Sequence, residues 1–198
     1  MNIGLTGGIA TGKSTVSALL VNKGALLVDA DVIAREVMLP GHPVLSAVTD
    51  HFGQAVLLAD GTLDRKKLGE IVFHDPTQRQ ALNDITHPAI RREIRMQMES
   101  LEREYPDKLV VVDIPLLFES GLEAMFERVM MVYAPKATQL ERLMKRNRLS
   151  RDEASARIRS QMDIEEKKQR ADIVIDNSGD AEQTKRQVDE FWLQSGYA

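Results

Sequence analysis

The beginning of the chain constrains its fold more than any other segment. Residues 2–5 are apolar and suit a buried β-strand, and residues 7–14 then read G-G-I-A-T-G-K-S. The pattern G-x-x-x-x-G-K-S between a strand and a helix is typical of the phosphate-binding loop of nucleotide triphosphatases and kinases. Residues 15–23 carry apolar side chains at helical spacing, and Gly24 ends that pattern. The alternative is a glycine-rich turn without a ligand.

The residue types in this loop suit a bound polyphosphate. Three of them are glycines, so we expect the backbone to pass through positive-φ conformations and to direct consecutive N–H groups at phosphate oxygens. Lys13 supplies charge for the β- and γ-phosphates, Ser14 offers a hydroxyl to Mg²⁺, and the helix turns its positive end toward the anion. The predicted nucleotide site consists of Gly7, Gly8, Ala10, Thr11, Gly12, Lys13, Ser14 and Thr15.

Composition excludes several other classes of protein. The net charge of -4, from 26 basic and 30 acidic residues, gives no basic footprint, so we expect no nucleic-acid partner. The chain has no cysteine, which rules out disulfides and thiolate metal sites and fits a reducing cytosol. No stretch approaches membrane-spanning length, and no signal-peptide pattern precedes the first strand. We therefore expect a cytoplasmic protein with no membrane partner.

Five apolar segments alternate with helical patterns along the 198 residues. Such alternation predicts an α/β fold with a five-stranded parallel sheet flanked by helices, and the continuous apolar runs suit strands that are covered on both faces. The predicted strands are residues 2–5, 25–29, 109–114, 129–133 and 173–176.

The gap between the second and third strands is long and mostly helical. Asp64 is suited to cap a helix over 65–73, Asp75-Pro76 starts another, and Thr86-His87-Pro88 starts a third that runs to about 105. We interpret residues 40–106 as an inserted helical domain, and residues 1–39 with 107–198 as the nucleotide-binding core. Open α/β sheets bind ligands at the carboxyl edge, so the insertion is suited to a second substrate.

Acidic residues stand at the ends of two predicted strands. Asp29 and Asp31 follow the second strand, where a carboxylate can accept a proton from an attacking hydroxyl. The alternative is that one of them caps the helix over 32–38, and each carboxylate can do one job. Asp113 ends the third strand and is suited to hold Mg²⁺ directly or through water. Ile114 follows it where hydrolysing ATPases usually have Glu, which favours transfer over hydrolysis.

Two basic helices joined by a short hinge resemble a lid over about 136–165. The first spans about 136–147, and Ser150 with Glu153 forms a capping-box pattern that starts the second. A lid excludes water and can bring guanidinium groups onto a transferring phosphate. Acidic residues are interleaved with the basic ones, so the alternative for most of these charges is a solvated helix face.

Taken together, these motifs resemble those of the dephospho-coenzyme A kinase family over nearly the whole chain. They are L-T-G-G-I-x-x-G-K-S at the phosphate loop, D-A-D-x-I-A-R at 29–35, H-P-x-I-R at 87–91, D-I-P-L-L-F-E at 113–119 and A-D-x-V-I-D-N at 171–177. The resemblance implies a phosphate-loop kinase core with an inserted acceptor-binding domain and a lid. It also implies transfer of the γ-phosphoryl of ATP, with Mg²⁺, to the ribose 3′-hydroxyl of dephospho-CoA.

The resemblance also implies roles for residues on the nucleotide side. Lys13 and Arg146 would neutralise charge on the phosphoryl group in transfer, with Arg142 a weaker candidate. Ser14 and Asp113 would hold Mg²⁺. Asn177 would contact the adenine of ATP, although an Asn-Ser-Gly turn explains this residue almost as well.

On the acceptor side, the resemblance makes Asp31 the base or orienter of the 3′-hydroxyl. For His87 the alternative is a helix N-cap partner, and for Phe118 it is core packing. His87 and Arg91 are four residues apart, hence on one helix face. The implied acceptor-binding residues are Asp29, His87, Arg91, Pro115, Leu116, Phe118 and Glu119.

Two other functions compete with this interpretation. A kinase for another small acceptor, such as a nucleoside monophosphate, would have a similar phosphate loop and lid, but not the motifs at 87–91 and 113–119. A guanine-specific switch would carry Asn-Lys-x-Asp, whereas the only Asn-Lys here is Asn22-Lys23, followed by Gly24-Ala25. We expect small-molecule partners, ATP and dephospho-CoA, and a monomer or weak homo-oligomer.

Overall fold

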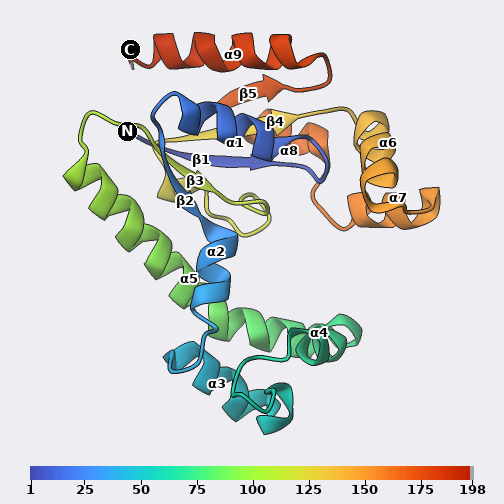
Figure 1. Ribbon diagram of the computed structural model, residues 1–198. Helices are drawn as coiled ribbons and strands as arrows, with labels where there is room; N and C mark the ends of the chain where they lie inside the picture. The colour runs from blue at the N-terminus through green and yellow to red at the C-terminus, as the bar shows by residue number, and fades with distance from the viewer. Residues whose placement is uncertain (197–198) are drawn as a thin grey trace. The chain divides into compact units, whose positions relative to one another are not determined.

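The structure of the protein is a computed structural model that describes residues 1–196. It contains a five-stranded sheet (Figure 1). The strand order is β2-β3-β1-β4-β5, and β1 pairs in parallel with β3 and β4, as β4 does with β5. Every predicted strand is confirmed, with small shifts at the ends. The strands are β1 Asn2–Gly7, β2 Leu26–Asp29, β3 Val110–Asp113, β4 Arg128–Tyr133 and β5 Ile173–Asp176.

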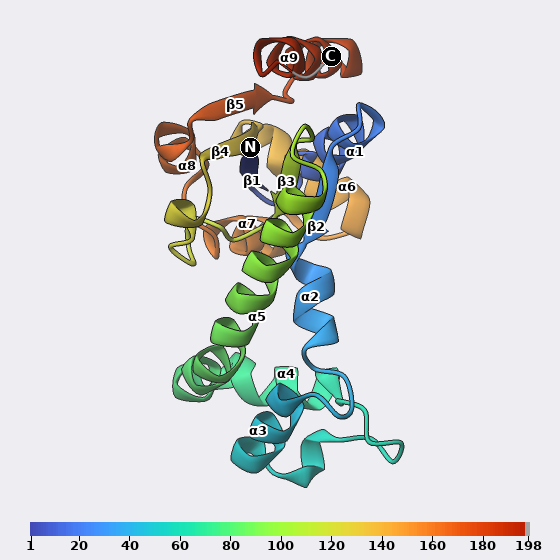
Figure 2. The same cartoon turned by 90° about the vertical axis from the view of Figure 1, so that its left-hand side faces the viewer.

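Helices cover both faces of this sheet. Alternate residues of a strand point to opposite faces, and on β4 Met130 and Val132 join one apolar cluster while Met131 and Tyr133 join another. The first cluster is completed by α1 (Lys13–Asn22) and α9 (Ala181–Gln194), the second by α8 (Ile164–Arg170). Figure 2 shows α1 and α8 on opposite sides of the sheet. Burial on both faces explains why the strands read as continuous apolar runs.

The strand order reverses direction beside β1, the central strand. The chain passes from β1 through α1 to β2, which lies two places away, while β4 follows on the other side. Open α/β sheets bind ligands outside the carboxyl ends of strands at such a reversal. The fold therefore places the ligand crevice at the ends of β1 and β3, where Gly7 and Asp113 lie.

The chain forms two compact units, divided after Val28 and after Gln97. The helical unit, Asp29–Gln97, contains α2 (Ala30–Glu36), α3 (Pro43–Phe52), η1 (Gln54–Val56), α4 (Arg65–His74) and the first part of α5 (Pro76–Glu104). The sheet unit contains the rest, including η2 (Glu123–Met125). We expected the insertion at 40–106. The unit begins earlier because Ala34 and Met38 line one cavity with Leu68 and Ile90, so α2 packs with the later helices.

The prediction of a separate helix starting at Thr86-His87-Pro88 is wrong. The single helix α5 runs through Pro88, which lacks an N–H and leaves the carbonyl of Asp84 without its helical donor. One turn earlier, the Thr86 hydroxyl donates to the Leu82 carbonyl at 2.9 Å. The helical pattern on both sides outweighs the preference of proline for a helix start. The caps at Asp64 and Asp75 are confirmed by bonds from the N–H groups of the first turns that follow.

Within residues 1–196, the structure has no helix that is both long and apolar enough to cross a lipid bilayer.

Candidate functional site

The glycines of the phosphate loop serve two different purposes. Gly12 adopts φ 91°, as expected, but the other positive φ in the loop belongs to Ala10, at 60°. A Cβ atom on Gly7 would lie 2.7 Å from the Thr11 hydroxyl, and one on Gly8 would lie 2.3 Å from Nε2 of Gln139. The expectation of positive φ at Gly7 and Gly8 is therefore wrong. Those two glycines are needed because other groups approach the backbone closely.

The start of α1 is built for an anion. Gly12 is its N-cap and no side chain caps it. The N–H of Thr15 donates to the Gly12 carbonyl at 2.9 Å, so the N–H groups of Lys13 and Ser14 are the ones that keep their capacity for a ligand. Lys13, in the first turn, forms an ion pair with Asp113 at the end of β3. The structure thus brings together the predicted phosphate-binding ammonium and the predicted metal-binding carboxylate.

The donor set at this point fits a magnesium ion. The Ser14 hydroxyl and the Asp113 carboxylate are hard oxygen ligands, which Mg²⁺ prefers, and Mg²⁺ is usually bound by one or two carboxylates together with substrate phosphates. Ser14 is exposed in the first turn of α1, whereas Asp113 is 9% exposed. The residues present are therefore suited to a metal bound with a nucleotide.

Asn177 packs against the phosphate loop from the end of β5. Its Nδ2 donates to the carbonyl of Thr11 at 2.7 Å, and a Cβ on Gly12 would lie 2.0 Å from that nitrogen. Arg142 donates from Nη2 to the carbonyl of Asn177 at 2.9 Å. The turn that follows is made by Asp176, whose carboxylate accepts the N–H of Ser178. The structure thus brings Asn177 and Arg142 to the loop. The Asn177 side chain binds the loop, and the turn is made by Asp176 instead.

The two predicted basic helices are present as α6 (Lys136–Asn147) and α7 (Arg151–Arg159), and the Ser150–Glu153 capping box is formed in full. Arg146 is exposed near the end of α6, and its Nε donates to Asn147 at 2.8 Å. No hydrogen bond among the described residues joins Arg146 to the phosphate loop. Of the two candidate arginines, only Arg142 is tied to a residue that contacts the loop.

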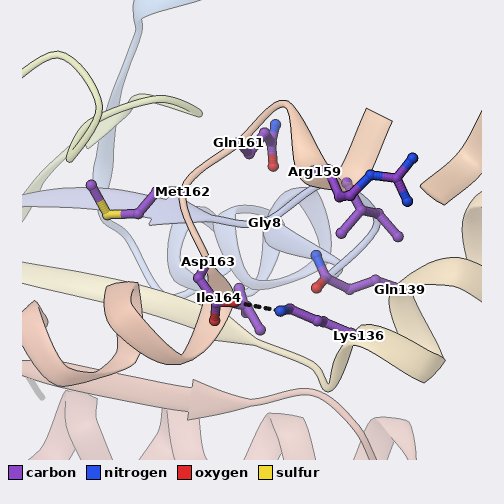
Figure 3. Close-up of a pocket in the computed structure, with 9 residues that line it drawn as sticks. Gly8, Lys136, Gln139, Arg159, Gln161, Met162, Asp163 and Ile164 are labelled. Carbon is purple, nitrogen blue, oxygen red and sulfur yellow. Dashed lines mark hydrogen bonds and ion pairs between the residues drawn. The ribbon is translucent and has the colours of Figure 1, made fainter. Parts of the chain in front are cut away.

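A cavity of about 350 Å³ lies between the outer side of the phosphate loop and the lid segment (Figure 3). Gly8 lines it together with Gln139 of α6, with Arg159 at the end of α7 and with Gln161 between α7 and α8. The ion pair of Lys136 with Asp163, the N-cap of α8, crosses its edge. The cavity has cationic and amide groups along its wall, so it suits an anionic or polar ligand. The remaining wall residues are Lys136, Ile158, Met162, Asp163 and Ile164.

The segment after β3 is divided between buried and exposed side chains. The Pro115 carbonyl accepts the Thr6 hydroxyl at 3.2 Å, and Leu116 is 43% exposed. Phe118 is only 3% exposed, with the Arg170 guanidinium 5.1 Å from its ring centre. The buried ring offers little surface to an acceptor, so core packing accounts better for Phe118 than the acceptor contact we expected.

Glu119 is engaged within the sheet unit. Its Oε1 lies 2.7 Å from Nζ of Lys167 and accepts the N–H of Met162 at 3.0 Å. These contacts give Glu119 a structural task that the sequence did not suggest.

In the helical unit, Asp29 takes the capping role. Its Oδ1 accepts the N–H groups of Asp31 at 2.8 Å and of Val32 at 3.1 Å, so it is the N-cap of α2. The side chain of Asp31 is exposed and makes no hydrogen bond within residues 1–196. Asp29 therefore caps α2 through one carboxylate oxygen, whereas the Asp31 carboxylate takes no part in the cap.

His87 and Arg91 lie one turn apart on α5, inside the helix, so the N-cap alternative for His87 is wrong. Burial lowers the pKa of His87 below 6.5, the positive charge of Arg91 lowers it further, and the Asp84 carboxylate opposes this. The lowered pKa favours the neutral imidazole of His87, which can donate or accept a hydrogen bond beside a cationic neighbour.

We expect an NMR titration to give His87 a pKa below 6.5, and Arg91→Met to raise that pKa without restoring it fully, since burial is the larger cause. Arg92→Met is the matched control. Because the folded pKa is depressed, the unfolded chain binds the proton first, and the stability contributed by neutral His87 declines as the pH falls below 6.5. A His87 pKa at or above 6.5 would contradict this account.

Sequence reasoning missed three side chains that contact the phosphate loop. Gln139 lies on α6, and its Nε2 donates to the carbonyl of Ile9 at 2.8 Å. Gln161 lies between α7 and α8, and its Oε1 accepts the N–H of Ile9 at 2.8 Å. Lys167 lies on α8, is 0% exposed, and has its Nζ 3.3 Å from the carbonyl of Gly7. The sequence around Lys167 is E-E-K-K-Q-R, which reads as a solvated helix face and carries no signal that one lysine is buried.

Comparisons with known proteins lead to the family that the motifs resemble. The family model described as dephospho-CoA kinase matches residues 1–183. A dephospho-CoA kinase from Halalkalibacterium halodurans is 50% identical over 188 residues, covering 95% of this chain and 93% of the relative. One from Carboxydothermus hydrogenoformans is 51% identical over 186 residues, covering 94% and 90%.

Solved structures give the same result for the fold. Dephospho-CoA kinase from Campylobacter jejuni aligns with a TM-score of 0.76 at 35% identity, covering 99% of this chain and 96% of that one. Shikimate kinase from Bacteroides thetaiotaomicron aligns with a TM-score of 0.50 at 13% identity, covering 99% and 98%, which bears on the fold alone. The architecture is thus that of phosphate-loop kinases.

Proposed function

The chain belongs to the dephospho-CoA kinase family, and from this premise we propose how its residues divide the work of phosphoryl transfer. The enzyme is an ATP-dependent kinase that phosphorylates dephospho-CoA, in the final step of CoA synthesis. The reacting hydroxyl is the 3′-hydroxyl of the acceptor ribose, and the products are CoA and ADP. The observation that carries the nucleotide side of this proposal is the ion pair of Lys13 with Asp113 at the uncapped start of α1.

On the nucleotide side, the triphosphate of ATP binds the backbone of residues 7–15 and the ammonium of Lys13. Phosphoryl transfer proceeds through a loose transition state with charge on the phosphoryl oxygens, so catalysis depends on positioning and on electrostatic stabilisation. Lys13 supplies that charge from within the loop. Ser14 and Asp113 would hold Mg²⁺, and the bound ion would neutralise phosphate charge.

On the acceptor side, Asp31 orients the 3′-hydroxyl and accepts its proton as the oxygen forms its bond to the γ-phosphorus. The bond from that phosphorus to the bridging oxygen breaks, and ADP leaves with the electron pair. The exposed carboxylate of Asp31, not engaged by the cap that Asp29 provides, supports this assignment. In the helical unit, the proposed acceptor-binding residues are His87 and Arg91, on one face of α5. In the sheet unit they are Pro115 and Leu116.

The lid helices contribute a cation to the transferring group. The bond of Arg142 to Asn177 beside the loop supports Arg142 in this role, whereas the guanidinium of Arg146 donates to Asn147. Asn177 contacts the adenine through a surface other than the amide nitrogen that binds Thr11. Asp29 and Glu119 act on the acceptor mainly by shaping the backbone around it, because their carboxylates cap α2 and pair with Lys167.

An acceptor panel tests the proposal. Purified protein with MgATP is offered dephospho-CoA, nucleoside monophosphates, adenosine and shikimate, and ADP release is followed. We expect dephospho-CoA to give the largest kcat/KM and ³¹P NMR to show a new phosphate at the 3′ position. A phosphate elsewhere on the product, or a nucleoside monophosphate as the best substrate, would contradict it and would favour a kinase for another acceptor.

A cytoplasmic location remains part of this proposal on the grounds of composition, and a monomer or weak homo-oligomer remains an expectation.

A further inference from the structure

Three side chains from outside the phosphate loop hold its outer edge. The Oε1 atom of Gln161 accepts the N–H of Ile9 at 2.8 Å, and Nε2 of Gln139 donates to the carbonyl of Ile9 at 2.8 Å. Nζ of Lys167 lies 3.3 Å from the carbonyl of Gly7. Figure 3 shows Gln139 and Gln161 at the cavity beside Gly8. The roles proposed above use none of these side chains.

These contacts fix the direction of successive peptide units. In a planar trans peptide the C=O and the following N–H point in opposite directions. Holding the carbonyls of Gly7 and Ile9 outward therefore directs the N–H groups of Gly8 and Ala10 the other way. The N–H of Ile9 is bound to Gln161, so the Gly8 carbonyl turns toward Thr11, whose N and Oγ1 donate to it at 3.2 and 2.9 Å.

Burying the ammonium of Lys167 costs free energy, so its partners at the loop and nearby matter. Its side chain is 0% exposed, and a buried ammonium has a large desolvation penalty unless it is paired and hydrogen-bonded. Oε1 of Glu119 supplies the opposite charge at 2.7 Å. The same oxygen accepts the N–H of Met162 at 3.0 Å, so the loop is linked through Lys167 to the chain just before α8.

Gln139 is also buried against the loop. It is 2% exposed, and its Nε2 faces the position where a Cβ on Gly8 would lie at 2.3 Å. The amide nitrogen has to face the Ile9 carbonyl, because the other orientation of the amide would oppose two oxygens. Gln139 stands on α6, near the start of the lid segment. Gln161 stands between α7 and α8, near its end, and Lys167 lies just beyond it on α8.

We propose that Gln139, Gln161 and Lys167 are positioning residues that hold the peptide units of residues 7–10 in the anion-binding arrangement before the nucleotide binds. They act through the backbone of the loop. The inference rests on the role proposed above for that loop. A nest whose N–H groups are already directed inward does not have to be reorganised by ATP, so both affinity and the placement of the γ-phosphoryl depend on these side chains.

Gln161→Leu is the primary test, because it removes an acceptor from a half-buried side chain and leaves no buried charge. Lys167→Met is the second variant. The matched controls are Gln169→Leu and Lys168→Met, which change the same residue types at exposed positions of α8. The measurements are the melting temperature, calorimetric Kd values for a non-hydrolysable MgATP analogue and for dephospho-CoA, and steady-state kcat and KM for both substrates.

We expect Gln161→Leu to raise the Kd of the ATP analogue about tenfold and to lower kcat about tenfold or more, because misplacement by a fraction of an ångström is amplified in the rate. Lys167→Met should have the larger effect on both quantities. The Kd for dephospho-CoA should stay unchanged, and both control variants should behave as wild type.

A purely structural role gives a different pattern. If Gln161→Leu lowers the melting temperature while the ATP-analogue Kd, both KM values and kcat per folded enzyme stay at wild-type values, the inference is wrong. Should Lys167→Met fail to fold, Gln161→Leu decides alone. Failure of the proposed function is distinguishable, since in that case the wild-type protein itself would not bind the ATP analogue or would prefer another acceptor.

Discussion

Asp31→Asn is expected to lower kcat by roughly 10² to 10⁴ while leaving the melting temperature almost unchanged, the range usual for general acid–base groups. Asparagine keeps the volume and a hydrogen-bonding oxygen but loses the negative charge that accepts the proton. The structure strengthens this prediction, because the cap of α2 is provided by Asp29 and does not need Asp31. Affinity for ATP should change little, since the carboxylate acts on the acceptor hydroxyl.

The neighbouring aspartate is the matched control. Asp29→Asn keeps a competent N-cap, whereas Asp29→Ala should lower the free energy of unfolding by about 1 kcal/mol. Thermal melts, ATP titrations and steady-state rates on these variants separate the two carboxylates. An inactive Asp29→Asn enzyme beside an active Asp31→Asn enzyme would reverse the assignment without affecting the family.

Lys13→Ala is expected to lower kcat by about 10² or more, because electrostatic positioning supplies most of the catalysis in phosphoryl transfer. The side chain is the ammonium at the start of α1, and it pairs with the proposed metal-binding carboxylate of Asp113. The KM for dephospho-CoA should be unaffected. The measurement is steady-state ADP release, with circular dichroism to verify that the variant is folded.

Lys23→Ala is the control for the loss of a lysine from the same helix region. Lys23 follows the last turn of α1 and pairs with Asp189 at 2.6 Å, so its removal should leave kcat unchanged. Near-normal turnover in folded Lys13→Ala would mean that the loop is not where phosphoryl transfer takes place.

The strands and the Ser150–Glu153 capping box could be predicted from local sequence patterns. The strands are continuous apolar runs because both sheet faces are covered, and the Ser150–Glu153 capping box forms because both partners lie within one helical turn. The exception is α5. A proline preceded by Thr-His reads as a helix start, yet the helical pattern on either side continues through Pro88.

Burial was the property that the sequence misjudged most often. Phe118 and Lys167 are both interior side chains, and neither burial follows from the neighbours in sequence. Phe118 stands in a motif that suggested an acceptor contact, and Lys167 stands in a charged run that suggested solvent. In both cases the side chain is covered by residues far away along the chain, and a local sequence pattern contains no information about such residues.

The sequence by itself determined the five-stranded α/β fold, the phosphate-loop motif and the family, because these depend on residue types at fixed short spacings. Only the tertiary structure decided which aspartate caps α2, why Gly7 and Gly8 cannot carry a Cβ, and that Gln139, Gln161 and Lys167 hold the loop. The physical reason is the distance along the chain. Gln161 and Ile9 are 152 residues apart, and Lys167 and Gly7 are 160 apart, so their contacts exist only after the sheet and its covering helices have packed.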